Sequence, residues 1–131
     1  MNGASMDLYL PDTNIFIYAF HGEEPAATRV KTWITSKQLI VSSIVAAEFL
    51  SGGQDVERDK FLALLDRLGT TPVDTAVART ASDYKRQFLK QKPGLRLPDA
   101  LIAATCKLYS ATLVTNNPGD FPMDDITKLS L

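Results

Sequence analysis

Four acidic residues stand where a carboxylate could take part in chemistry. Asp12 follows a predicted strand, Glu48 lies inside an apolar helix, Asp99 is near the start of a helix, and Asp120 lies in a loop. In an open parallel sheet the strand-to-helix junctions fall on one edge, so carboxylates from distant segments can converge there. Converging carboxylates repel one another, and a hard divalent cation relieves the repulsion. Because Mg²⁺ or Mn²⁺ completes its shell with water and substrate phosphate, the pattern points to metal-assisted phosphodiester hydrolysis.

Three of these acids also have an ordinary structural explanation, and both interpretations stay open at this point. Asp12 can be the N-cap of a helix that begins at Thr13. Asp99 falls in the first turn of a helix, where the helix dipole favours negative charge. Asp120 fits a Pro-Gly-Asp turn.

Glu48 is harder to explain structurally. It interrupts the run 44–50, which is apolar on every side and is therefore expected to be a helix buried all round. A carboxylate taken out of water persists only with a partner such as a hydrogen-bond donor, a base or a metal. This position therefore favours a functional role.

The other reactive side chains support no competing chemistry. His21, the only histidine, has no serine or cysteine partner in a nucleophile motif and is expected to be solvated at a helix end. Cys106, the only cysteine, lies among small apolar residues and is expected in the core. No Gly-rich phosphate loop follows a predicted strand, which argues against a P-loop or a dinucleotide-binding fold.

A basic run precedes Asp99. Between positions 85 and 98 the chain carries five cations and no acid: Lys85, Arg86, Lys90, Lys92 and Arg96. Such a run beside an acidic metal site can hold a phosphate backbone. A solvated helix face followed by a charged loop explains the same residues equally well.

Short apolar segments that alternate with amphipathic ones must position these side chains. We predict strands at 7–10, 39–42, 71–74, 112–115 and 126–129. We predict helices at 13–22, 23–36, 44–50 with Ser43 as N-cap, 55–68, 75–89 and 98–109. This alternation predicts βαβ units and a mainly parallel sheet of about four to five short strands with helices on both faces.

Composition is that of an ordinary globular protein. The 131 residues are 45% hydrophobic and 22% charged with a net charge of −1, so we expect one domain over 1–131 and no polyanion binding from bulk charge. Residues 1–6 are expected to be a frayed extension. The single cysteine suits a reducing compartment, and the N-terminus lacks the features of a signal peptide. We therefore expect a cytoplasmic protein without a membrane span.

Taken in order, four motifs resemble the PIN domain, and more narrowly the VapC-type ribonuclease toxins of prokaryotic toxin–antitoxin pairs. They are DTN at 12–14, VAAEF at 45–49, LPDALIAA at 97–104, and LVTNN at 113–117 followed by DF at 120–121. The resemblance covers nearly the whole chain. It implies a three-layer α/β/α fold and Mg²⁺- or Mn²⁺-dependent endonucleolytic cleavage of RNA by a metal-activated water.

The resemblance also implies roles for individual residues. Asp12, Glu48 and Asp99 would be metal-site carboxylates, and polar neighbours that orient ligands or water would be Thr13, Asn14 and Thr115. The family often has a further acid after the last of these strands, whereas this sequence has Asn117 there. That departure leaves Asp120 as the fourth carboxylate and puts a second metal position in doubt.

Toxins of this kind are typically homodimers neutralised by a cognate antitoxin, which gives the partners that the resemblance implies beside the RNA substrate. An alternative is a degenerate PIN module that binds RNA or protein without cutting, motivated by Asn117. A second alternative is a metal-dependent phosphatase of another α/β fold, although no Asp-x-Asp follows the first strand.

Overall fold

A computed structural model describes residues 6–131, and residues 1–5, which make up most of the predicted frayed extension, lie outside the described residues. The described chain contains three strands, six α-helices and one 3-10 helix. In chain order these are β1 (Leu8–Pro11), α1 (Thr13–Phe20), α2 (Ala26–Thr35), α3 (Ser43–Ser51), α4 (Asp55–Leu68), α5 (Thr75–Gln87), α6 (Leu97–Tyr109), β2 (Ala111–Val114), η1 (Pro118–Asp120) and β3 (Lys128–Leu129).

The predicted parallel sheet is confirmed, but it has fewer strands than predicted. Its order is β1-β2-β3, and both pairings are parallel. The predicted strands 39–42 and 71–74 are reduced to single bridges, in which Leu39 pairs with Tyr9 and Ser42 pairs with Thr71. The segment at 39–42 lies beside β1 and enters α3 at Ser43, directly after the bridge at Ser42. Thr71 lies beside Ser42 and is followed by Pro72, which has no N–H to continue a ladder.

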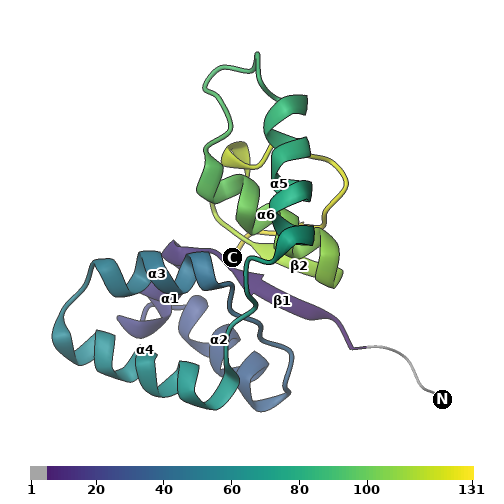
Figure 1. The fold of residues 1–131 in the computed structure, drawn as a ribbon. Helices are drawn as coiled ribbons and strands as arrows, with labels where there is room; N and C mark the ends of the chain where they lie inside the picture. The colour runs from purple at the N-terminus through teal and green to yellow at the C-terminus, as the bar shows by residue number, and fades with distance from the viewer. Residues whose placement is uncertain (1–5) are drawn as a thin grey trace.

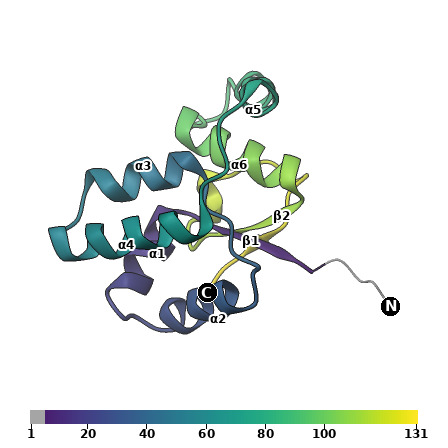
Figure 2. The same ribbon diagram turned by 60° about the horizontal axis from the view of Figure 1, so that its bottom comes forward.

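Helices cover the sheet on two sides, as the three-layer prediction requires. Figures 1 and 2 show α1 to α4 gathered on one side of β1, with α5 and α6 on the other. Leu10 of β1 and Leu113 and Val114 of β2 are fully buried between the two groups. None of the helices in residues 6–131 has the length and apolar character needed to cross a membrane.

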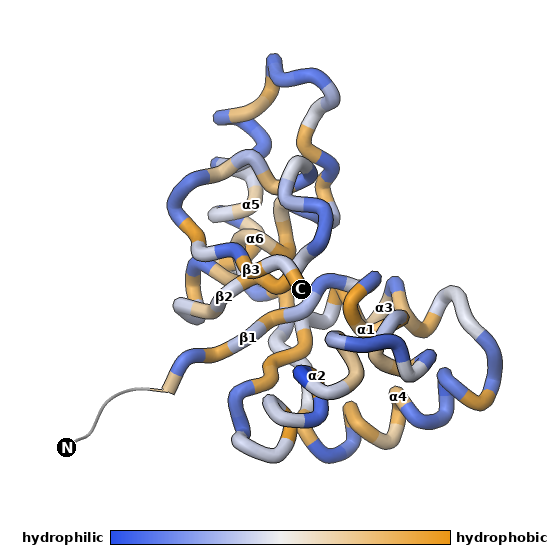
Figure 3. Tube along the Cα trace, turned by 180° about the vertical axis from the view of Figure 1, so that it is seen from behind, coloured by the Kyte–Doolittle hydropathy of each residue, from blue (hydrophilic) through white to orange (hydrophobic). Residues whose placement is uncertain are grey.

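The helix boundaries follow local capping chemistry. The amphipathic helix α4 spans Asp55–Leu68 as predicted and ends at Gly69, whose φ of 72° is a conformation that favours glycine. Its alternation of polar and apolar residues is visible along the tube in Figure 3. The predicted N-cap Ser43 is wrong by one residue, because the hydroxyl of Ser42 accepts the Val45 N–H at 3.0 Å.

Four phenylalanines join α1, α3 and α4. Phe61 of α4 is fully buried, stacks on Phe49 of α3 with ring centroids 4.1 Å apart, and meets Phe16 and Phe20 of α1 edge to face. Aromatic pairs of this geometry add to the free energy that burial alone supplies. The three helices that follow or flank β1 are therefore held in fixed relative positions.

Candidate active site

One hollow of about 190 Å³ collects the carboxylates singled out from the sequence. It lies at the carboxyl ends of β1 and β2, and we call it the acidic hollow; its acidic lining is Asp12, Glu48, Asp99 and Asp120. Thr13, Asn14 and Asn117 also line it, whereas Thr115 lies beneath Asp12 and is fully buried. The topology thus brings together side chains from four separate segments, as a parallel sheet edge allows.

Asp12 is held from two directions. Its backbone N–H donates to the Val114 carbonyl at 2.9 Å, and its carboxylate accepts the Ile15 N–H at 3.3 Å as the cap of α1. Burial raises the pKa of Asp12, hydrogen bonds from Thr115 and from backbone N–H groups oppose that rise, and the charge of Asp120 adds to it. The N-cap interpretation is therefore correct, and the capping carboxylate also faces the acidic hollow.

Glu48 is held by Thr13. The Thr13 hydroxyl donates to Glu48 Oε1 at 2.7 Å across 35 positions of sequence. The expectation that its helix is buried all round is wrong, because Glu48 is half-buried and the neighbouring Ala47 is exposed. One side of α3 opens onto hollows rather than onto packed side chains, so the carboxylate keeps access to solvent.

The pKa of Asp99 is strongly shifted by its place in the acidic hollow. Burial raises the pKa of Asp99 to about 6, and the charges of Asp120, Glu48 and Asp12 push in the same direction. Only Arg96 opposes them, since its guanidinium favours the ionised carboxylate. Mutual repulsion among the four acids is thus built into the fold.

Arg96 is a lining residue that the sequence did not single out. It occupies the N-cap position of α6, three residues before Asp99, and is exposed on the rim. The only sign of its role in the sequence was its position in the basic run, and that position did not distinguish Arg96 from the four other cations. Lys85, by contrast, donates to the Leu95 carbonyl at 2.5 Å.

The second strand ends in a polar loop. The Asn117 N–H donates to Thr115 Oγ1 at 3.0 Å, and Asp120 is exposed at the end of η1. Asn117 therefore lines the acidic hollow with an amide where the resemblance led us to expect an acid, and Asp120 is the carboxylate of this loop that lines the hollow.

The donor set fits a hard divalent cation shared with a substrate. Within residues 6–131 no three His, Cys, Asp or Glu side chains stand close enough together to hold an ion by themselves. Mg²⁺, however, is commonly bound through one or two carboxylates, with water and substrate phosphate completing the shell. The four carboxylates of the lining, and the repulsion among them that adds to the effect of burial on the pKa of Asp99, suit that arrangement.

Two other features do not compete with this site. A larger hollow of about 460 Å³ beside α1, α2 and α4 is lined mostly by apolar residues, with Lys31, Lys60 and Arg67 and no carboxylate. Cys106 is buried in the core as predicted, and burial raises the pKa of its thiol to about 12, so it is no nucleophile.

Comparison with known proteins agrees with the motifs. The family described as PIN domain matches residues 9–124. Ribonuclease VapC19 from Mycobacterium tuberculosis is 30% identical over 115 residues, which cover 87% of this chain and 92% of the relative. The crystal structure of VapBC2 from Rickettsia felis bound to a promoter DNA fragment has a TM-score of 0.75 and 25% identity, covering 95% of this chain and 98% of that chain. A toxin–antitoxin complex from Klebsiella pneumoniae has a TM-score of 0.70 and 26% identity, covering 87% and 90%. The chain belongs to the PIN domain family.

Proposed function

We propose that this protein is a metal-dependent endoribonuclease and the toxin of a toxin–antitoxin pair. The observation that carries the proposal is the acidic hollow, where four carboxylates from separate segments face a rim arginine. The relative named a ribonuclease and the toxin–antitoxin complexes of similar fold support the substrate class and the kind of partner.

Asp12 and Asp99, assisted by Glu48 and Asp120, would hold Mg²⁺ or Mn²⁺. When bound, the ion supplies positive charge to the phosphate oxygens and lowers the pKa of a coordinated water. The chain's own residues do the positioning: Thr13 fixes the Glu48 carboxylate, and Thr115 with the backbone N–H groups at the start of α1 opposes the rise in the pKa of Asp12 that burial causes. Arg96 on the rim can pair with a phosphate of the substrate backbone.

The partners follow from the same proposal. An antitoxin protein would neutralise the toxin, and a homodimer is the assembly implied by the resemblance. Light scattering of the purified full chain would measure the dimer directly, and a monomer at micromolar concentration would contradict it.

The decisive experiment compares the wild type with Asp12→Asn. Purified protein is incubated with structured RNA and Mg²⁺ or Mn²⁺, with and without EDTA. We expect cuts that EDTA abolishes and that Asp12→Asn loses. Asparagine is as good an N-cap as aspartate, so this variant keeps the start of α1 and tests the charge alone. Asp66→Asn is the matched control, because Asp66 is exposed on α4 and does not line the acidic hollow.

Equal trace cleavage by the wild type and Asp12→Asn would assign the activity to contamination. RNA retention without products would favour the module that binds without cutting. Metal binding has a separate readout: Mn²⁺ should raise the melting temperature of the wild type and not of Asp12→Asn.

A further inference from the structure

A second hollow adjoins the acidic hollow and shares Glu48 with it. It encloses about 210 Å³ between the end of α1, the end of α3 and the start of α4. That volume is below the range for drug-sized ligands. The space suits one flat ring system, placed beside whatever occupies the acidic hollow.

The lining of this hollow combines apolar and polar side chains. Ile17, Phe20 and Phe49 form an apolar wall, and the rings of Phe20 and Phe49 are 5.3 Å apart. Aromatic and apolar walls of this kind are the surfaces on which unstacked nucleobases pack. The same hollow is lined by His21 and Glu57, which can bind the polar edge of such a ring.

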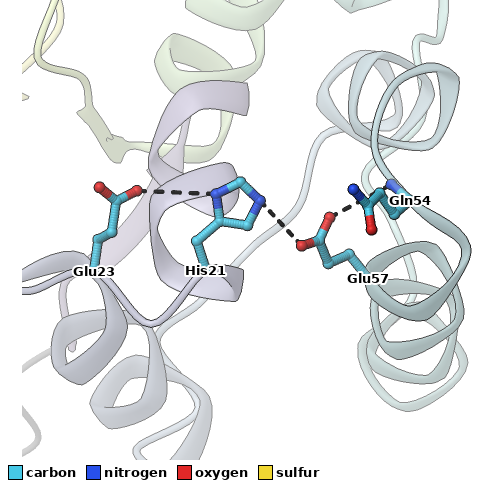
Figure 4. A network of polar contacts seen from close by, with 4 residues as sticks. All are labelled: His21, Glu23, Gln54 and Glu57. Carbon is cyan, nitrogen blue, oxygen red and sulfur yellow. Dashed lines mark hydrogen bonds and ion pairs between the residues drawn. The ribbon is translucent and has the colours of Figure 1, made fainter.

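Glu57 is held in place by its neighbours. His21 Nε2 lies 3.0 Å from Glu57 Oε1, and the Gln54 N–H donates to Glu57 Oε2 at 3.5 Å in a capping box. Figure 4 shows His21 between Glu57 and Glu23, whose Oε2 is 4.0 Å from His21 Nδ1. A carboxylate has about four lone-pair sites, so Glu57 keeps capacity for two further donors.

We propose that this second hollow is a base subsite that binds a guanine next to the scissile phosphate of the RNA. The assignment rests on the proposed ribonuclease function, because the acidic hollow must hold that phosphate. Guanine is the base whose Watson–Crick edge offers two adjacent N–H donors, at N1 and N2, and a carboxylate accepts both. Adenine, cytosine and uracil each place an acceptor oxygen or nitrogen beside the donor, which a carboxylate repels.

The glycines at the end of α3 leave the entrance open. Gly52 and Gly53 both line the second hollow, and a Cβ added at Gly52 would meet no atom within 4 Å. The φ of Gly52 is −112°, which any residue adopts, so a side chain can be introduced there without strain. We therefore expect Gly52→Leu to fold and to place a side chain at the lining of the second hollow.

The test is the base profile at cut sites in an RNA library with randomised sequence. The wild type should enrich guanine at one fixed position beside the cut. Glu57→Gln replaces one acceptor oxygen with a donor and should reduce that enrichment roughly tenfold or more, and Gly52→Leu should do the same by blocking entry. Glu23→Gln, on the far side of His21, should keep the wild-type profile.

Unchanged profiles in Glu57→Gln and Gly52→Leu, or enrichment of another base, overturn the proposal. His21 provides a readout that needs no cleavage, because it is the only histidine of the chain and its ring signals need no assignment. Titration with 5′-GMP should move those signals more than 5′-AMP does, and Gly52→Leu should suppress the difference. Equal effects of the two nucleotides overturn the subsite. If the wild type cuts no RNA, the proposed ribonuclease function is contradicted. The nucleotide titration still tests whether the second hollow binds guanine.

Discussion

Replacing Asp99 by asparagine should stabilise the protein while it abolishes cleavage. The charged form of Asp99 is disfavoured by burial and by three neighbouring carboxylates, and its pKa rises from 3.8 to about 6. Asparagine has nearly the same shape and carries no charge, so it removes the repulsion without leaving a cavity. The same substitution removes an oxygen ligand from the proposed metal site.

The magnitude follows from the pKa. The difference between 3.8 and about 6 corresponds to about 3 kcal/mol, at about 1.4 kcal/mol for each tenfold change in proton affinity. Asp99 is only half-buried, and solvent screening reduces this figure to about 1–2 kcal/mol. For a chain of 131 residues that gain should raise the melting temperature by roughly 3–8 °C.

The gain should depend on pH in a defined direction. Unfolded Asp99 ionises above about pH 4, whereas folded Asp99 keeps its proton up to about pH 6. The folded state therefore binds more protons in this window, and the contribution of Asp99 to stability falls as pH rises from 4 to 6. Asparagine does not titrate, so the free energy of unfolding of the variant should equal that of the wild type near pH 4 and exceed it above pH 6.

Urea unfolding in EDTA at pH 4, 6 and 8 measures this difference, with Asp66→Asn as the control for an exposed acid. Equal stability of Asp99→Asn and wild type at pH 8, or an advantage that persists undiminished at pH 4, would refute the electrostatic reasoning. Added Mn²⁺ should close the gap at pH 8 by stabilising the wild type alone.

Three further predictions concern Thr13, Arg96 and the aromatic cluster around Phe61. Thr13→Val removes the hydroxyl that donates to Glu48 and should lower the cleavage rate about tenfold or more. Thr13→Ser keeps that hydroxyl and should cleave at the wild-type rate. Equal cleavage rates in the valine and serine variants would show that the hydrogen bond is dispensable. Arg96→Gln should move the acidic limb of the cleavage–pH profile upward, because Arg96 lowers the pKa of Asp99, while Arg96→Lys should leave it in place. Phe61→Ala should cost about 3–5 kcal/mol of unfolding free energy in urea, since the ring is fully buried against three others, and a cost below about 1 kcal/mol would contradict that packing.

Patterns within a segment predicted the elements well. The apolar spacing and the closing Gly69 gave α4 its bounds, and Pro98 near the start of α6 marked that helix to within one residue. The segment at 39–42 has the composition of a strand. Whether it forms a ladder depends on how many of its residues run beside β1, and only Leu39 is bridged to that strand, at Tyr9. The amino-acid composition does not predict this number of paired residues, so the sequence overestimated the number of strands.

Properties set by distant neighbours were harder to predict. The apolar residues around Glu48 do not reveal that part of α3 faces open space. Arg96 differs from the other cations of its run only because the fold brings it beside Asp99. The pairing of His21 with Glu57 joins two helices whose contact has no trace in local spacing.

The distribution of the four carboxylates over the chain has a consequence for its synthesis. Asp12 and Glu48 leave the ribosome early, whereas Asp99, Asp120 and the strand β3 that completes the sheet come last in the described chain. A nascent chain therefore contains the residues of α1 to α4 and their four phenylalanines before it contains all four acids. Charge repulsion among the four acids therefore arises only with the final segments, and a partly made chain does not yet carry all four carboxylates of the acidic hollow.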